Sequence, residues 1–85
     1  MNKKITVKRD SGEICYCILS GDESLEDQFN KWYFGSKHPQ NGLCVNFCET
    51  SVDVVDYYHA EKMASFKVLS IEDTNEDICL KWIFI

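Results

Sequence analysis

The sequence has no long hydrophobic run, little proline or glycine, and few basic residues relative to acidic ones. No stretch approaches the ~20 apolar residues that a membrane-spanning helix needs, and this excludes a helical membrane protein. The four glycines are scattered, which excludes a glycine-rich phosphate-binding loop. Nine Lys and Arg against 14 Asp and Glu give a net charge of −5, which argues against binding nucleic acid through its phosphates.

The composition is otherwise that of a folded globular chain. Hydrophobic residues make up 45% of the 85 residues and aromatic residues 13%, too many for a disordered chain. The length suits one small domain, and no linker or internal repeat divides it. We therefore predict a single domain over residues 1–85.

The N-terminus and the cysteines bear on the cellular compartment. A secretory signal needs a continuous apolar stretch after its basic residues, whereas Lys8, Arg9 and Asp10 interrupt the chain almost at once. We therefore expect a cytoplasmic protein in a reducing environment. The five cysteines, an odd number, are then expected to be free thiols.

The first half of the chain predicts a β-hairpin followed by a helix. Alternating apolar residues over 5–7 and an apolar run over 14–19 flank a turn signal at 10–12. Ser24 is a suitable helix N-cap and Gly35 a suitable C-cap. The apolar face between them comprises Leu25, Phe29, Trp32 and Tyr33.

The second half predicts three strands and a further helix. Alternation over 43–47, 66–71 and 78–85 is typical of strands. Thr50 resembles a second N-cap, and the helical stripe that follows it comprises Val52, Val55, His59 and Met63. We predict a helix here, with a strand over 52–58 as the alternative because β-branched and aromatic residues are concentrated there.

These elements follow the order ββ-α-β-α-ββ, which predicts an α+β domain with a mainly antiparallel sheet and two helices. The expected core comprises Ile5, Val7, Ile14, Ile18, Phe29, Trp32, Val45, Phe47, Val55, Met63, Val68, Leu80, Trp82 and Phe84. A core of this size is adequate for 85 residues.

The cysteines and histidines do not form a recognisable chemical site. Cys44 and Cys48 would lie two pleats apart on one strand, roughly 13 Å, too far to chelate one metal ion. No local signature links His38 or His59 to a cysteine nucleophile. We therefore expect no enzyme, no catalytic residue, no cofactor and no metal. A metal-binding module that uses the cysteines stays an alternative.

The distribution of charge is the most distinctive property of the sequence. Residues 1–9 carry four basic and no acidic residues, whereas the other 76 residues carry five basic and 14 acidic ones, a net charge of −9. On the predicted second helix, the exposed face combines carboxylates with a tyrosine, a residue that is enriched in binding hot spots. The partner-binding residues that we predict are Asp53, Asp56, Tyr57 and Glu61 on this face and Glu72, Asp73, Glu76 and Asp77 in an acidic loop.

A compact acidic domain can compete for a basic groove that is shaped for phosphates. Bacteriocin immunity proteins, restriction inhibitors and anti-CRISPR proteins share these bulk properties of size and charge. We therefore expect a small binding protein of the inhibitor type, whose partner is a protein with a basic surface such as a nuclease, and neither nucleic acid nor a membrane. The alternative is a subunit that self-associates or joins an assembly through its last strand, where Ile83 and Ile85 form a second apolar face.

Overall fold

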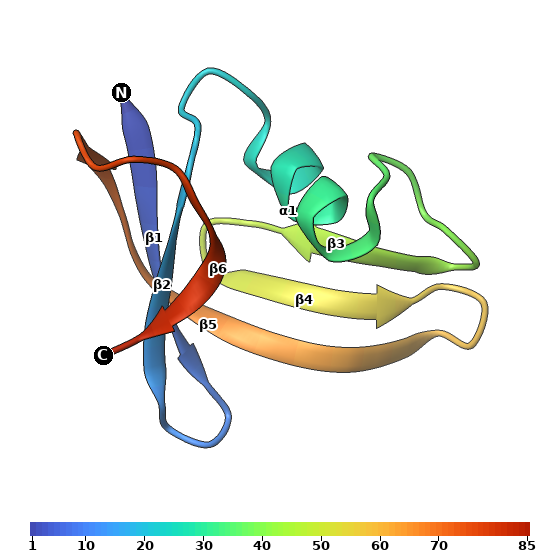
Figure 1. Cartoon of the computed structure of the whole chain (residues 1–85). Helices are drawn as coiled ribbons and strands as arrows, with labels where there is room; N and C mark the ends of the chain where they lie inside the picture. The colour runs from blue at the N-terminus through green and yellow to red at the C-terminus, as the bar shows by residue number, and fades with distance from the viewer.

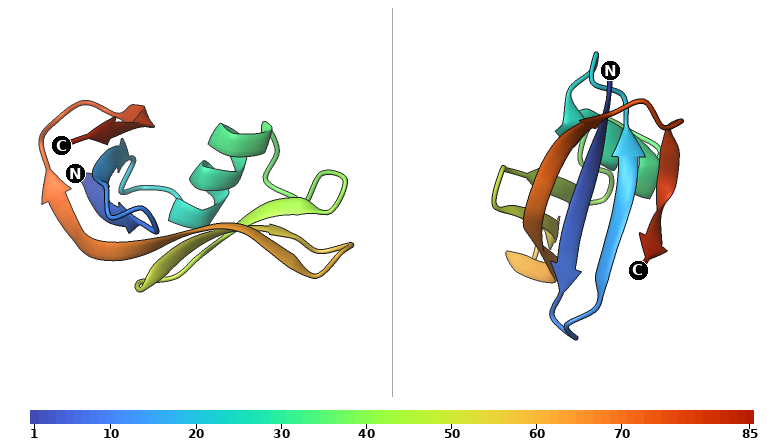
Figure 2. Two further views of the ribbon diagram at one scale, coloured as in Figure 1. Left: turned by 90° about the horizontal axis from the view of Figure 1, so that it is seen from below. Right: turned by 90° about the vertical axis from the view of Figure 1, so that its left-hand side faces the viewer.

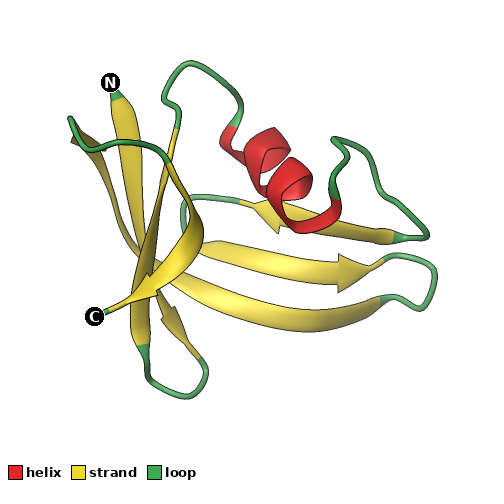
Figure 3. Cartoon of the chain, in the orientation of Figure 1, coloured by secondary structure: helices red, strands yellow, loops and turns green.

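The computed structural model describes all 85 residues, which form one strongly curved antiparallel sheet and one helix (Figures 1 and 3). The elements are β1 (Asn2–Arg9), β2 (Ile14–Leu19), α1 (Leu25–Phe34), β3 (Leu43–Phe47), β4 (Ser51–Asp56), β5 (Glu61–Thr74) and β6 (Cys79–Phe84). The strand order across the sheet is β3-β4-β5-β1-β2-β6, so β3 and β6 are its two edges. The α+β class with a mainly antiparallel sheet is confirmed.

The long strand β5 joins the two halves of the sheet. Its first part pairs with β4 and its second part with β1, and Phe66 and Lys67 pair with both neighbours. Register shifts interrupt both pairings, and bulges of this kind bend a strand and increase its twist. As a result β5 curves from one half of the sheet to the other (Figure 2, left).

The helix α1 lies on the concave side of the sheet and begins and ends as predicted. The Ser24 hydroxyl accepts a hydrogen bond from the Asp27 amide, and Gly35 closes the helix in the left-handed conformation at a φ of 73°. Phe29 is fully buried and stacks on Trp32 and Phe47 at ring-centroid distances of 5.7 and 5.5 Å. This face holds the helix against the sheet.

The predicted second helix is wrong, and the alternative of a strand is confirmed. Residues 51–56 form β4, a tight turn follows, and β5 begins at Glu61. β4 pairs along its whole length with β3 on one side and β5 on the other. Hydrogen bonds to two neighbouring strands stabilise the strand more than the burial of a few helically spaced apolar residues would stabilise a helix. β-Branched side chains also suit a central strand.

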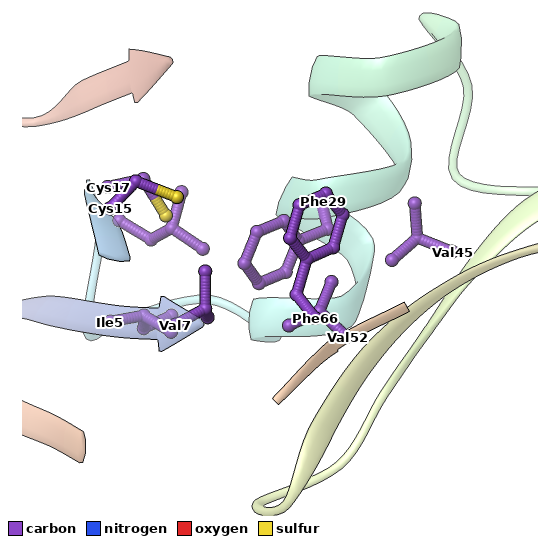
Figure 4. Packing of buried hydrophobic residues seen from close by; sticks show 9 residues of the cluster. Ile5, Val7, Cys15, Cys17, Phe29, Val45, Val52 and Phe66 are labelled. Carbon is purple, nitrogen blue, oxygen red and sulfur yellow. The ribbon is translucent and has the colours of Figure 1, made fainter. Parts of the chain in front are cut away.

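The core lies between α1 and the concave face of the sheet (Figure 4). It comprises Ile5, Val7, Cys15, Cys17, Leu19, Phe29, Val45, Val52 and Phe66. Cys15 and Cys17 act here as small apolar side chains. Four residues that were predicted for the core are exposed instead: Ile14, Met63, Leu80 and Phe84. Three of these lie on the edge strand β6 or at a bulge of β5, and Ile14 begins β2.

Candidate functional site

The eight acidic and aromatic residues that the sequence predicts as a binding face do not form one surface. Asp56, Tyr57 and Glu61 lie at the turn between β4 and β5, whereas residues 72–77 lie at the other end of β5. The two groups lie on opposite sides of the molecule (Figure 1), whose longest dimension is 38 Å. The predicted residues therefore form two separate regions, which differ in how their charges are paired within the chain.

Asp53 is part of the sheet and not of an exposed helical face. Its carboxylate accepts hydrogen bonds from the Ser65 and Ser51 hydroxyls at 2.6 and 3.3 Å, and the Lys62 ammonium lies 3.7 Å away. Its side chain is only 17% exposed. Because residues 51–56 form a strand and not a helix, the Asp53 carboxylate lies beside Ser65 and Lys62 of β5, which already balance its charge.

The acidic segment over residues 72–77 is partly neutralised by the basic first strand, which pairs with two of its four carboxylates. β1 runs antiparallel beside the end of β5, so that Lys3 pairs with Asp73, and Lys4 reaches Glu76 at 3.7 Å. The hydrogen bond from Lys3 lowers the pKa of Asp73 below its usual range. The Asn2 side chain also donates to the Glu76 carbonyl at 2.8 Å. The uneven charge of the sequence is thus partly cancelled in space.

The turn between β4 and β5 is held in shape by Asp56. One carboxylate oxygen accepts from the amides of Tyr58 and His59 at 3.0 and 3.3 Å, and the other lies 2.8 Å from the His59 Nδ1 atom. The hydrogen bond with His59 is the main cause that lowers the pKa of Asp56. Ala60 completes the turn in the left-handed region at a φ of 52°. Asp56 thus fixes the backbone from which the neighbouring aromatic side chains project.

Two tyrosines project from this turn. Tyr57 is 55% exposed and Tyr58 77% exposed, large values for aromatic side chains. The Tyr57 hydroxyl donates to the Asn46 side chain at 3.0 Å, and its amide donates to the Gly42 carbonyl at 2.7 Å. The Tyr58 ring packs over Gly42 so closely that an added Cβ atom there would lie 2.8 Å from it. Both tyrosines are therefore exposed and yet restrained.

We call this region the aromatic tip, defined as Asp56, Tyr57, Tyr58, His59 and Glu61. Its two carboxylates give it a formal charge of −2 with His59 neutral, and Glu61 belongs to none of the ion pairs. The tip therefore combines rigid aromatic area with negative charge, a combination that suits a partner surface carrying cations.

A groove of about 530 Å³ lies between α1 and the segment that leads into β6. Trp32, Ile78 and Leu80 form its apolar part. Its charged residues are Glu23, Asp27, Lys31 and Lys37, so the formal charges that line the groove cancel. The groove is therefore less selective for a basic partner than the aromatic tip.

All five cysteines are free thiols. Burial is the main cause that raises the pKa of Cys17 to about 12, whereas hydrogen bonds with the Ser51 and Thr50 hydroxyls lower the pKa of the exposed Cys48 to about 7. No group of three or more His, Cys, Asp or Glu side chains is arranged to hold a metal ion. α1, with 10 residues, is too short to cross a membrane.

No family model, no curated protein and no solved structure matches this chain. The candidate site therefore rests on its own geometry.

Tyr58 and His59 belong to the site but are not among the residues predicted from the sequence. The helical stripe predicts an inward-facing His59, whereas its side chain is 73% exposed and bonded to Asp56. A signal for the turn was present, because an Asp that begins a turn accepts hydrogen bonds from the amides two and three residues later. The helical spacing of the apolar residues around it concealed that signal.

Proposed function

We propose that this protein is a non-enzymatic binding protein that occludes a basic site on a partner protein, in the manner of a nuclease inhibitor, restriction inhibitor, anti-CRISPR protein or immunity protein. The observation that carries the proposal is the aromatic tip, where two restrained tyrosines are exposed beside carboxylates. Rigid aromatic side chains provide contact area at little cost in conformational entropy, and tyrosine is enriched among residues that dominate binding energy.

The charge of the molecule supports the same kind of partner. A net charge of −5 accelerates encounter with a basic surface and disfavours nucleic acid itself. Lysine and arginine side chains on the partner would pack over the Tyr57 and Tyr58 rings and approach Glu61. Residues 72–77 would contribute only long-range attraction, because Lys3 and Lys4 already pair with two of their carboxylates.

The test compares immobilised wild-type protein with two variants in capture from a lysate, with quantitative mass spectrometry at low and high salt. Tyr58→Ala/Glu61→Lys alters the aromatic tip, and the control Glu72→Lys makes the same change of charge at the far end of β5. We expect a basic protein that the wild type and the control both retain, that the tip variant loses, and whose capture weakens as salt rises.

The captured protein is then purified and, if it is a nuclease, assayed on its nucleic acid with increasing amounts of wild type and tip variant. Inhibition by the wild type alone supports occlusion. Capture that is insensitive to salt, or equal for the tip variant and the wild type, contradicts the proposal.

A further inference from the structure

The outer edge of β6 has no partner strand. β6 pairs only with β2, and it is the last strand in the order of the sheet (Figure 2, right). An exposed edge strand presents unpaired backbone N–H and C=O groups that can pair with another strand. The exposed apolar side chains beside this edge, Ile78 and Leu80, are 50% and 48% exposed.

The sequence around the start of β6 is symmetric about Cys79, the first residue of the strand, with Asp77 and Ile78 in the loop just before it and Leu80 and Lys81 within it. One position away on each side lie the aliphatic residues Ile78 and Leu80, and two positions away lie Asp77 and Lys81, which have opposite charges. Both charged residues are exposed, and neither belongs to any ion pair within the chain. Such a pattern is complementary to itself when two copies run antiparallel.

We propose that two copies of this chain associate through residues 77–81, paired antiparallel about a two-fold axis at Cys79, with Asp77 and Ile78 extending β6 when the second copy binds. In this register Asp77 of each copy lies opposite Lys81 of the second copy, and Ile78 lies opposite Leu80. An isologous interface of this kind requires a surface that is its own complement. Opposite charges and apolar pairs directly across an antiparallel ladder stabilise it.

Apolar surface lies beside this edge. The groove beside α1 is lined by Ile78 and Leu80 together with Trp32, so apolar side chains of the second copy have apolar surface to cover. The opposite edge of the sheet does not offer the same opportunity, because Asn30 of α1 occupies both backbone groups of Val45 in β3. Self-association is thus directed to one edge.

The pairing is short, and the association is accordingly weak. β6 bulges between Cys79 and Ile83 in its pairing with β2, and bulges limit regular pairing along an edge. A five-residue ladder also buries far less than the ~1,600 Å² of a standard stable interface. The expected state is a rapidly exchanging dimer that forms at high protein concentration and that a covalent bond can capture.

The test uses the thiols on the axis. Residues directly opposite in an antiparallel pair have Cα atoms about 4.5 or 5.5 Å apart, and both distances suit a disulfide. Diamide would accept two electrons and two protons from the two Cys79 thiols as the bond forms. Cys79 is half-buried, and Cys48→Ser removes the one fully exposed thiol. We expect covalent dimer from this variant, and about tenfold less from Cys48→Ser/Cys79→Ser, because the remaining thiols are buried.

Charge reversal, each variant in the Cys48→Ser background, tests the register. Asp77→Lys or Lys81→Asp alone places like charges across the axis and lowers the yield about tenfold. A 1:1 mixture of these two variants restores the yield as a heterodimer, identified by mass. The control is Lys67→Asp. Lys67 is an exposed residue of β5, and this variant makes the same change of charge as Lys81→Asp, so we expect an unchanged yield of covalent dimer.

The proposal is overturned if Cys79 gives no disulfide above the yield of the double cysteine variant, if the single charge reversals leave the yield unchanged, or if their mixture gives no heterodimer. Circular dichroism of each variant verifies its fold. Mass spectrometry of the oxidised wild type shows directly, without the charge variants, whether Cys79 of one copy is bonded to Cys79 of the other. Tyr58→Ala/Glu61→Lys leaves the yield intact, so failure here and failure of the proposed function are separate results.

Discussion

The two edge strands of the sheet differ in whether another element hydrogen-bonds their outer backbone groups. At β3, the side chain of Asn30 donates to the Val45 carbonyl at 2.9 Å and accepts from the Val45 amide at 2.8 Å, so that α1 takes the place of a neighbouring strand. Glu26 accepts from the Phe47 amide at 3.0 Å in the same manner. At β6, the Trp82 indole packs inward, and the one side-chain hydrogen bond to the strand's backbone is from its own Cys79 thiol to the Lys81 carbonyl, a long contact of 4.0 Å.

A small curved sheet can thus block strand pairing at one edge and leave the other edge able to pair. A helical amide that satisfies both groups of an edge residue closes that edge permanently, since exchanging it for another strand would leave buried polar groups without partners. An edge strand whose outer backbone groups are not bonded by another element keeps those groups free for a partner.

The largest effect is expected from breaking the attachment of β6. Trp82 lies at ring-centroid distances of 5.2 Å from Phe66 and 5.2 Å from Trp32, and its indole N–H donates to the Tyr33 hydroxyl. Trp82→Ala should lower the free energy of unfolding by about 3 kcal/mol, measured by urea denaturation. Trp82→Phe keeps the aromatic packing and should lose less than half as much; equal losses would show that packing does not hold this edge.

The next effect is expected from uncovering β3. Asn30→Ala leaves the buried amide and carbonyl of Val45 without partners, which should cost about 2 kcal/mol of unfolding free energy. The same denaturation measurement applies. Asn75→Ala, which removes an exposed side chain in the loop before β6, should change stability little. If the two variants are equally stable, α1 does not close the β3 edge.

The interior strands β1 and β5 provide a smaller effect, which depends on pH. Because the pKa of Asp73 is lowered by Lys3, the ion pair adds stability above the unfolded-state pKa of about 3.9 and loses it as pH falls through the lower folded value. Asp73→Asn should therefore flatten the fall in stability below pH ~4 in urea titrations. Equal slopes for Asp73→Asn and the wild type would contradict this role of the ion pair.

The smallest effect on stability is expected at Cys48, just beyond β3, where the measured quantity is the reactivity of the thiol. Cys48, with its pKa of about 7, should be alkylated by iodoacetamide with a rate that rises through a midpoint near pH 7. Thr50→Val/Ser51→Ala removes the hydroxyl donors and should move the midpoint upward toward the ordinary cysteine value. An unchanged midpoint would mean that these hydroxyls do not stabilise the thiolate.

Features that depend on neighbours in sequence could be predicted. The hairpin of β1 and β2, the N-cap at Ser24, the C-cap at Gly35 and the strand at 43–47 are all confirmed. Residues 50–63 were assigned wrongly because their apolar residues fit both a helical and a strand period. Pairing with β3 and β5 selects the strand. As a result the candidate site lies at a turn and not on a helical face.

An acidic chain with mainly antiparallel strands follows from local patterns, because caps, turn residues and alternation act over a few residues. Which charges stay unpaired and which edge of the sheet is closed depend on the tertiary structure. Lys3 and Asp73 are 70 residues apart, and Asn30 and Val45 are 15 apart, so no local pattern connects them. Each residue brings its own charge and hydrogen-bonding groups. Whether those groups find an ion-pair or hydrogen-bond partner depends on which elements the fold places side by side.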